Sequence, residues 1–102
     1  MTVNSSGNIS DDELDEIERR CEAASPPPWE AFVEGRDHSS GDDFIRIARG
    51  DEPDMYVFRS TDNGVPPASS EDLDFIAHAR QDITRLIAEV RRLRTNPGSP
   101  RP

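Results

Sequence analysis

The sequence predicts a small α+β fold with the order α-β-β-β-α, in which a three-stranded antiparallel meander follows an N-terminal helix and precedes a long C-terminal helix. Three observations predict this order. Apolar residues recur every three or four positions near both ends of the chain, which is the period of an amphipathic helix. The middle of the chain alternates apolar and polar side chains, as half-buried strands do. The stretches between these segments are rich in Gly, Pro, Asp and Ser, which are turn residues.

The first helix is expected to begin after Ser10. Ser10 followed three positions later by Glu13 is a capping box, in which each residue's side chain bonds the other's backbone N–H. The helix should end before the prolines at 26–28, because proline lacks the N–H that continues the helical ladder. Its apolar stripe is expected to consist of Leu14, Ile17, Cys21 and Ala24.

The three prolines stand directly before Trp29, the only tryptophan of the chain. A proline run is stiff and extended, so it determines where the next residue lies. We therefore interpret Trp29 as a core residue that locks a helix to the sheet. A ligand-stacking platform is the alternative for this side chain.

Three segments are expected to be strands: Trp29–Glu34, Phe44–Arg49 and Met55–Ser60. A longer, flexible connection at Gly35–Asp43 should join the first two, and a polar hairpin turn at Gly50–Asp54 should join the last two.

The final helix is expected from Ser70 to Arg94. Its apolar residues recur at alternating spacings of three and four, a heptad-like pattern more regular than a small sheet requires. They are Ile76, Ala79, Ile83, Leu86, Val90 and Leu93. We therefore expect a homo-oligomer that forms through Ile83, Leu86, Val90 and Leu93. Residues 9–94 would form one small domain, and residues 1–8 and 95–102 would be disordered tails.

The formal net charge is −9, and the acidic residues are concentrated in the first half. Residues 1–54 hold 15 acids and 5 arginines, a balance of −10, whereas residues 55–102 hold 6 acids and 7 arginines, a balance of +1. Such a front half repels nucleic acid and anionic lipid, so neither is expected as a partner. It suits a basic protein partner, or serves solubility alone. The candidate partner-binding acids on the first helix are Asp11, Asp12, Glu16 and Glu18.

Several function classes are disfavoured by residue usage. The chain has no lysine, which excludes a Schiff-base enzyme and a Walker-type phosphate loop. The single cysteine, Cys21, excludes an intramolecular disulfide. No secretion signal and no membrane-spanning stretch is recognised, so we expect a cytoplasmic protein.

Few residues of the chain are candidates for metal binding or catalysis. His78 lies four residues from both Asp74 and Asp82, and this row is either a metal-binding edge or a solvated helix face. His38, in the 35–43 connection, has acidic neighbours whose spacing does not match a calcium-binding loop. We find no catalytic motif and expect neither an enzyme nor a cofactor.

Two segments carry a resemblance to a known group of proteins. The corner P-P-P-W and the segment D-L-D-F-I-A-H-A-R-Q-D-I-T-R-L-I-A-E-V-R-R-L-R resemble the Ead-like early-region proteins of phages and prophages and their actinobacterial phage relatives. The resemblance covers Glu18–Trp29 and Asp72–Arg94. This chain departs from it at Pro27, where relatives often have glycine, and at Thr84, where they often have proline. The resemblance implies an accessory role in a mobile element and assigns no functional residues.

The leading hypothesis is a non-enzymatic phage or prophage accessory protein that binds a host or phage protein. One alternative is an oligomeric sponge that sequesters an anionic, nucleotide-like ligand among Arg46, Arg59 or Arg80. Another is an acidic inhibitor or immunity-type protein that occludes a basic surface.

Overall fold

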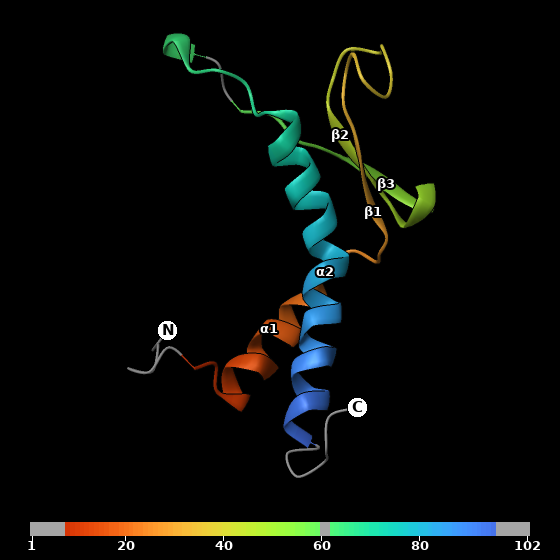
Figure 1. The fold of residues 1–102 in the computed structure, drawn as a ribbon. Helices are drawn as coiled ribbons and strands as arrows, with labels where there is room; N and C mark the ends of the chain where they lie inside the picture. Colours follow the sequence, from red (N-terminus) through yellow and green to blue (C-terminus); the bar gives the residue numbers. More distant parts are fainter. Residues whose placement is uncertain (1–7, 60–61, 96–102) are drawn as a thin grey trace. The chain divides into compact units, whose positions relative to one another are not determined.

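The computed structural model describes residues 8–59 and 62–95, and its elements follow the predicted order (Figure 1). The α+β arrangement with an antiparallel three-stranded meander is confirmed. The predicted tails fall almost wholly outside the described residues. The elements are α1 (Asp11–Ala23), β1 (Trp29–Phe32), β2 (Phe44–Ile47), β3 (Glu52–Tyr56) and α2 (Ser70–Thr95).

The chain divides into two compact units. The helical unit consists of Met1–Ala24 and Ile83–Pro102, and the sheet unit consists of Ser25–Asp82. The division falls inside α2, so the first half of this helix belongs to the sheet unit and the second half to the helical unit.

The helical unit begins with the predicted capping box. Ser10 Oγ accepts a hydrogen bond from the Glu13 N–H (3.0 Å), and Glu13 Oε1 accepts one from the Ser10 N–H (2.8 Å). α1 lies across the second half of α2 (Figure 1), and Leu14 of α1 and Ile87 of α2 are the buried apolar residues of this unit. No helix within the described parts of the chain is long and apolar enough to cross a bilayer.

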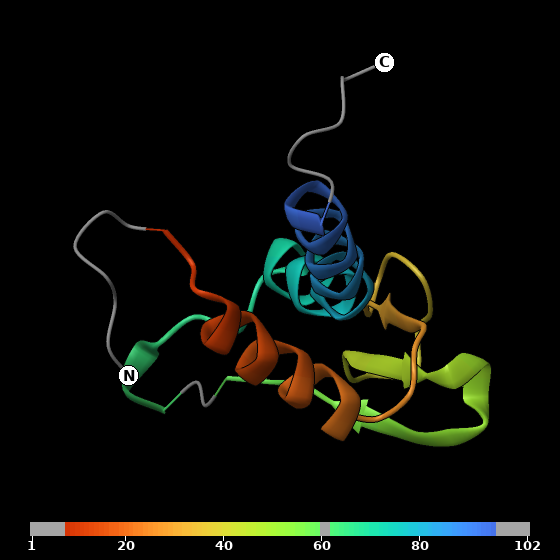
Figure 2. The same cartoon turned by 90° about the horizontal axis from the view of Figure 1, so that it is seen from below.

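The sheet unit is a meander in the strand order β1-β2-β3, whose course can be followed in Figures 1 and 2. β1 pairs with β2 from Trp29 opposite Ile47 to Phe32 opposite Phe44, and β3 continues with Tyr56 opposite Phe44. Because side chains alternate between the faces of a strand, Phe32, Phe44 and Tyr56 form one aromatic row across the sheet.

The opposite face of the sheet holds the main core. Ile45 and Ile47 are fully buried against Ala77 in the first half of α2, and Leu73, one turn before Ala77, is also fully buried. Partly buried apolar side chains surround this cluster: Trp29, Ala31, Ala48, Met55 and Val57.

The ends of β2 and β3 differ from the prediction. β2 ends at Ile47 because Ala48, Arg49 and Gly50 have φ angles of 51°, 57° and 95°, a left-handed turn that no strand can contain. The hairpin between β2 and β3 is confirmed, but the predicted bounds of its turn, Gly50–Asp54, are wrong. The chain reverses earlier, β3 begins at Glu52, and it ends at Tyr56 instead of Ser60.

Candidate functional site

The predicted self-association residues form an exposed apolar stripe, called here the α2 stripe. Leu86 is 62% exposed, Leu93 44% and Ile83 39%, whereas Val90 is half-buried. Ile87, the buried residue of this half of α2, lies on a neighbouring face of the helix. The described part of the helical unit therefore leaves most of Leu86 and part of Ile83 and Leu93 exposed.

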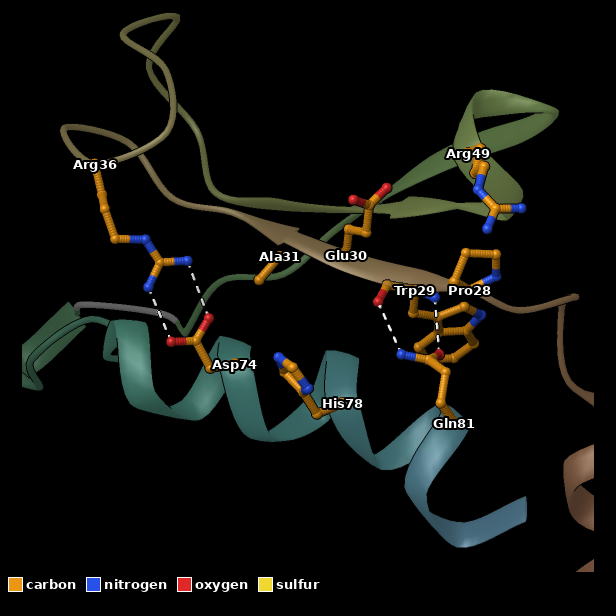
Figure 3. A pocket seen from close by; sticks show the side chains of 9 residues that line it. All are labelled: Pro28, Trp29, Glu30, Ala31, Arg36, Arg49, Asp74, His78 and Gln81. Carbon is orange, nitrogen blue, oxygen red and sulfur yellow. Dashed lines mark hydrogen bonds and ion pairs between the residues drawn. The ribbon is translucent and has the colours of Figure 1, made fainter. Parts of the chain in front are cut away.

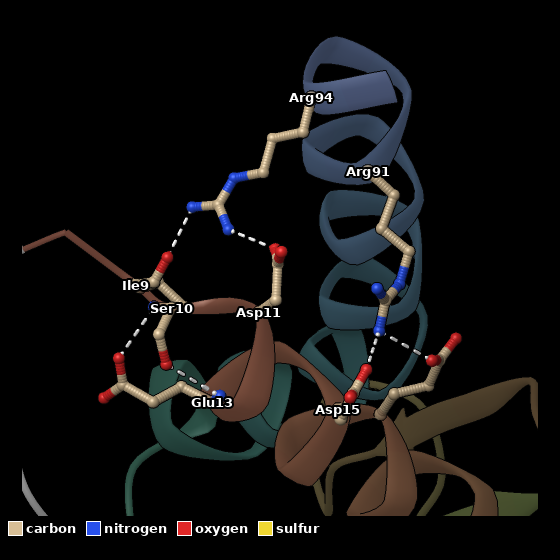
Figure 4. A network of polar contacts seen from close by, with 8 residues as sticks. Ile9, Ser10, Asp11, Glu13, Asp15, Arg91 and Arg94 are labelled. Atoms are coloured by element: carbon tan, nitrogen blue, oxygen red, sulfur yellow. Dashed lines mark hydrogen bonds and ion pairs between the residues drawn. The ribbon is translucent and has the colours of Figure 1, made fainter.

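Ion pairs hold α1 on the face of α2 that carries Ile87 (Figure 4). Arg91, four residues after Ile87, lies 2.9 Å from Asp15 Oδ1 and 2.9 Å from Glu18 Oε1. Arg94, a further turn along, lies 2.9 Å from Asp11 Oδ1 and donates to the main-chain oxygen of Ile9. Hydrogen bonding, with Asp15 foremost, raises the pKa of Arg91 above its usual value. These contacts direct α1 away from the α2 stripe.

The four candidate partner-binding acids divide into two pairs. Asp11 and Glu18 are engaged by arginines of the same unit, as described above. Asp12 and Glu16 are exposed and make no ion pair with the described part of the chain. Half of the proposed acidic surface is therefore already neutralised within the helical unit.

The three candidate anion-binding arginines have separate neighbours within the sheet unit. The Arg46 guanidinium lies 4.3 Å from the centre of the Phe32 ring. Arg59 lies 3.5 Å from Asp72 Oδ2, and Arg80 Nε donates to the Ser25 oxygen at 3.0 Å. Each guanidinium thus has its own local contact, and the pocket described next is lined by other arginines.

A pocket of about 460 Å³ lies between β1 and the first half of α2 (Figure 3). The Arg36–Asp74 ion pair stands at one end of it, and the indole of Trp29 and the amide of Gln81 lie at the other. Ala31 is part of the wall between them, and the remaining lining residues are Pro28, Glu30, Arg49 and His78.

Gln81 binds the main chain of Trp29 as a neighbouring strand would. Its Oε1 accepts from the Trp29 N–H at 2.9 Å, and its Nε2 donates to the Trp29 oxygen at 3.2 Å. The indole Nε1 of Trp29 donates to the Ser25 oxygen at 3.2 Å. The half-buried Trp29 thus packs on the core, as predicted, and also lines the pocket. Sequence reasoning missed Gln81, because nothing local marks it as a partner of a residue 52 positions away.

The sequence leaves the row of His78, Asp74 and Asp82 open between a metal-binding edge and a solvated helix face, and Arg36 binds one member of it, Asp74. Both Asp74 oxygens accept hydrogen bonds from Arg36, at 2.9 and 3.0 Å. These bonds lower the pKa of Asp74 and raise that of Arg36. Within residues 8–59 and 62–95, no group of three His, Cys, Asp or Glu side chains is placed to hold a metal ion.

The 35–43 connection is held by its own polar side chains. Asp37 Oδ2 accepts from the Val33 N–H at 2.9 Å, and Asp43 Oδ1 accepts from the Glu34 N–H at 2.8 Å. His38 Nδ1 accepts from the Ser40 N–H at 3.0 Å. These acids therefore act as caps for the backbone.

Comparison of the chain with protein-family models, with curated proteins and with solved structures gives no significant match.

Proposed function

We propose that this chain is a non-catalytic accessory protein that acts by binding protein, and that the α2 stripe is its binding surface. The observation that supports this most strongly is the exposure of regularly spaced apolar side chains, led by Leu86, in the second half of α2. Contiguous exposed apolar surface of this kind marks interaction sites in soluble proteins.

A second copy of the chain is the partner that the pattern favours. Apolar residues at alternating spacings of three and four match another helix with the same spacings, so the surface is complementary to itself. Two helices alone bury little apolar surface. Pairing two helical units would bring four helices around a shared apolar centre, which is a recurrent stable arrangement.

Charged residues beside the α2 stripe favour a parallel pair of α2 helices. In heptad terms, Glu89 occupies a g position and Arg94 the e position five residues later, the two positions that face each other across a parallel pair. Both already have partners in their own chain, Arg92 for Glu89 and Asp11 for Arg94. The contact between copies would therefore select orientation and add little stability.

The wider role is proposed from the resemblance to Ead-like phage proteins. It favours an accessory protein of a mobile element, for which we propose the bacterial cytoplasm as the location. The absence of catalytic motifs in the sequence supports a role in binding. The self-associated form would then present its exposed acids, among them Asp12 and Glu16, to a basic host or phage protein.

Sedimentation equilibrium from low to high micromolar protein tests the self-association. We expect a dimer or larger species for the natural chain. Leu86→Glu should shift the protein to monomer, because a carboxylate would have to be buried in the new interface. Ala88→Glu is the matched control, since it adds the same side chain at an exposed position outside the α2 stripe.

Circular dichroism on both variants separates dissociation from unfolding. A natural chain that stays a folded monomer at high micromolar concentration would exclude the second copy as partner. Equal dissociation by Ala88→Glu would exclude the α2 stripe as the surface.

A further inference from the structure

On the edge of β1 that does not pair with β2, most of the main-chain N–H and C=O groups are already hydrogen-bonded within the chain. β1 pairs with β2 on one side only, and the Pro28 oxygen accepts from the Ala48 N–H on that side at 2.9 Å. Main-chain groups of successive strand residues point to opposite edges. Residues 29, 31 and 33 therefore direct their N–H and C=O groups away from β2.

In two of these three residues, the outward-pointing main-chain groups are already hydrogen-bonded within the chain. Trp29 has both main-chain groups bound by the Gln81 amide. Val33 donates its N–H to Asp37 Oδ2 at 2.9 Å, and its oxygen accepts from the N–H groups of Arg36 (3.0 Å) and Asp37 (2.8 Å). Ala31, between them, makes no hydrogen bond on this edge with any described residue, and it lines the pocket.

We propose that this pocket binds a carboxamide group through the N–H and C=O of Ala31. An amide carries an acceptor oxygen and a donor N–H side by side, which is the complement of a strand residue's outward pair. Gln81 demonstrates the fit on Trp29, two residues away and on the same edge (Figure 3). A whole strand cannot pair with this edge of β1, because the outward-pointing N–H and C=O groups of the residues on either side of Ala31 are already hydrogen-bonded. The outward-pointing N–H and C=O of Ala31 can therefore pair with a single amide group.

The remaining side chains of the pocket favour a ligand that also carries negative charge. Arg36 is compensated by Asp74 at one end of the pocket. Arg49 makes no hydrogen bond or ion pair within the described residues, and the turn holds it in a left-handed conformation with φ of 57°. Glu30 also lines the pocket, but in Figure 3 its carboxylate points away from α2. A non-glycine residue is held in this region of φ at some conformational cost, and such residues are concentrated at functional sites.

The ligand class is therefore an amide with an anionic group nearby. This chemistry has two sources: a small compound, or a Gln or Asn side chain next to an acidic residue in a partner protein. The site lies in the sheet unit and shares no residue with the α2 stripe, so the inference is independent of the proposed self-association.

Nuclear magnetic resonance of the ¹⁵N-labelled full chain tests the site, with N-acetylglutamine as the probe. We expect the Ala31 amide resonance to shift saturably and its hydrogen exchange to slow. N-acetylglutamate is the matched control, because it replaces the amide donor by a carboxylate oxygen. No saturable shift at Ala31, or equal shifts with the two compounds, would overturn the proposal.

Two variants test the anionic part of the ligand. Arg49→Gln should weaken binding of N-acetylglutamine by about tenfold, because a hydrogen bond to a charged group is lost. Arg85→Gln makes the same substitution at an exposed position of the helical unit and should leave binding unchanged. Equal weakening by both variants would contradict the role of Arg49.

A short peptide that places a glutamine before a glutamate distinguishes the two sources. Tighter binding of the peptide than of N-acetylglutamine would assign the site to a partner protein, and equal or weaker binding would assign it to a small compound. Either result supports amide binding, provided that the shift at Ala31 is present.

Discussion

The two units of this chain are stabilised in different ways. The sheet unit has an apolar core, in which Ile45, Ile47 and Leu73 are almost completely removed from water. The helical unit buries Leu14 and Ile87 and is otherwise held by arginine–carboxylate pairs on its surface. Burial is the larger stabilising effect per residue, whereas exposed ion pairs contribute little. The unit with the smaller core also carries the α2 stripe, so its apolar surface remains available to a partner.

The chain provides a separate reporter for each unit. Trp29, its only tryptophan, lies in the sheet unit, so fluorescence follows that unit. Far-UV circular dichroism follows helix content, and α1 and the second half of α2 account for much of it. The difference in stabilisation between the two units can therefore be tested by unfolding one sample and following it with both probes.

The largest effect is expected from Ile45→Ala in the sheet unit. Ile45 is fully buried, so removing most of its side chain should cost about 2–5 kcal/mol, a large part of the stability of a domain this small. Urea unfolding followed by Trp29 fluorescence measures the change. Ile9→Ala makes the same substitution at a side chain that is 44% exposed, and should shift neither probe by much. Equal losses in the two variants would contradict the placement of the core.

A smaller effect is expected from Gln81→Ala. Two main-chain hydrogen bonds of Trp29 are lost, at roughly 1 kcal/mol each for part-buried groups. Hydrogen exchange at the Trp29 amide should become faster. Gln81→Glu should lie between the natural chain and Gln81→Ala, because a carboxylate still accepts from the N–H but no longer donates to the oxygen. Unchanged exchange at Trp29 in Gln81→Ala would argue that the strand edge is not closed this way.

The helical unit should be the more sensitive to salt. Arg91→Met removes the pairs with Asp15 and Glu18, and the loss of stability should be smaller than for Gln81→Ala and present mainly at low ionic strength. Thermal unfolding by circular dichroism at low and high salt measures it. Arg85→Met, at an exposed arginine without an ion pair to the described residues, serves as the control. If salt changed the stability of the sheet unit, followed by Trp29 fluorescence, by the same amount, the expected difference between the two units would be contradicted.

The smallest effect is expected from acid in the sheet unit. The hydrogen bonds from Arg36 hold the pKa of Asp74 below its unfolded value, so the folded state binds fewer protons. The stabilisation is therefore complete above the unfolded pKa of about 3.9 and is lost as pH falls through the folded pKa. Trp29-monitored stability should decrease below about pH 4, and Asp74→Asn should reduce that dependence. An unaltered pH dependence in the variant would argue against a contribution from this pair.

Local signals predicted much of the fold. Ser10 and Glu13 specify the start of α1 within four residues, and the apolar spacing of α2 extends over most of its length. The end of β2 was not predictable, because Ala48 and Arg49 are not residues that normally adopt positive φ. In that turn the packing of the sheet unit overrides the local preference of the backbone.

Contacts between residues distant in sequence account for what was missed at the candidate sites. Arg36 meets Asp74 across 38 positions, and Gln81 meets Trp29 across 52. Neither pair leaves a periodic pattern, since each depends on how β1, the following loop and α2 come together in the sheet unit. The α2 stripe was predicted because it is a property of a single helix.

Gln81 and Asp37 hydrogen-bond main-chain groups on the open edge of β1, and this also affects the tendency of the protein to aggregate at high concentration. An exposed strand edge is a template on which other chains add strands, and this is a common route to aggregation. On the β1 edge the row of free main-chain groups is shortened to the single residue Ala31, too short for another chain to add a strand along this edge. Gln81→Ala would extend that row to two outward-pointing residues. Light scattering and thioflavin fluorescence of concentrated samples, compared with Gln81→Glu, would show whether this one side chain keeps other copies from adding strands at the β1 edge.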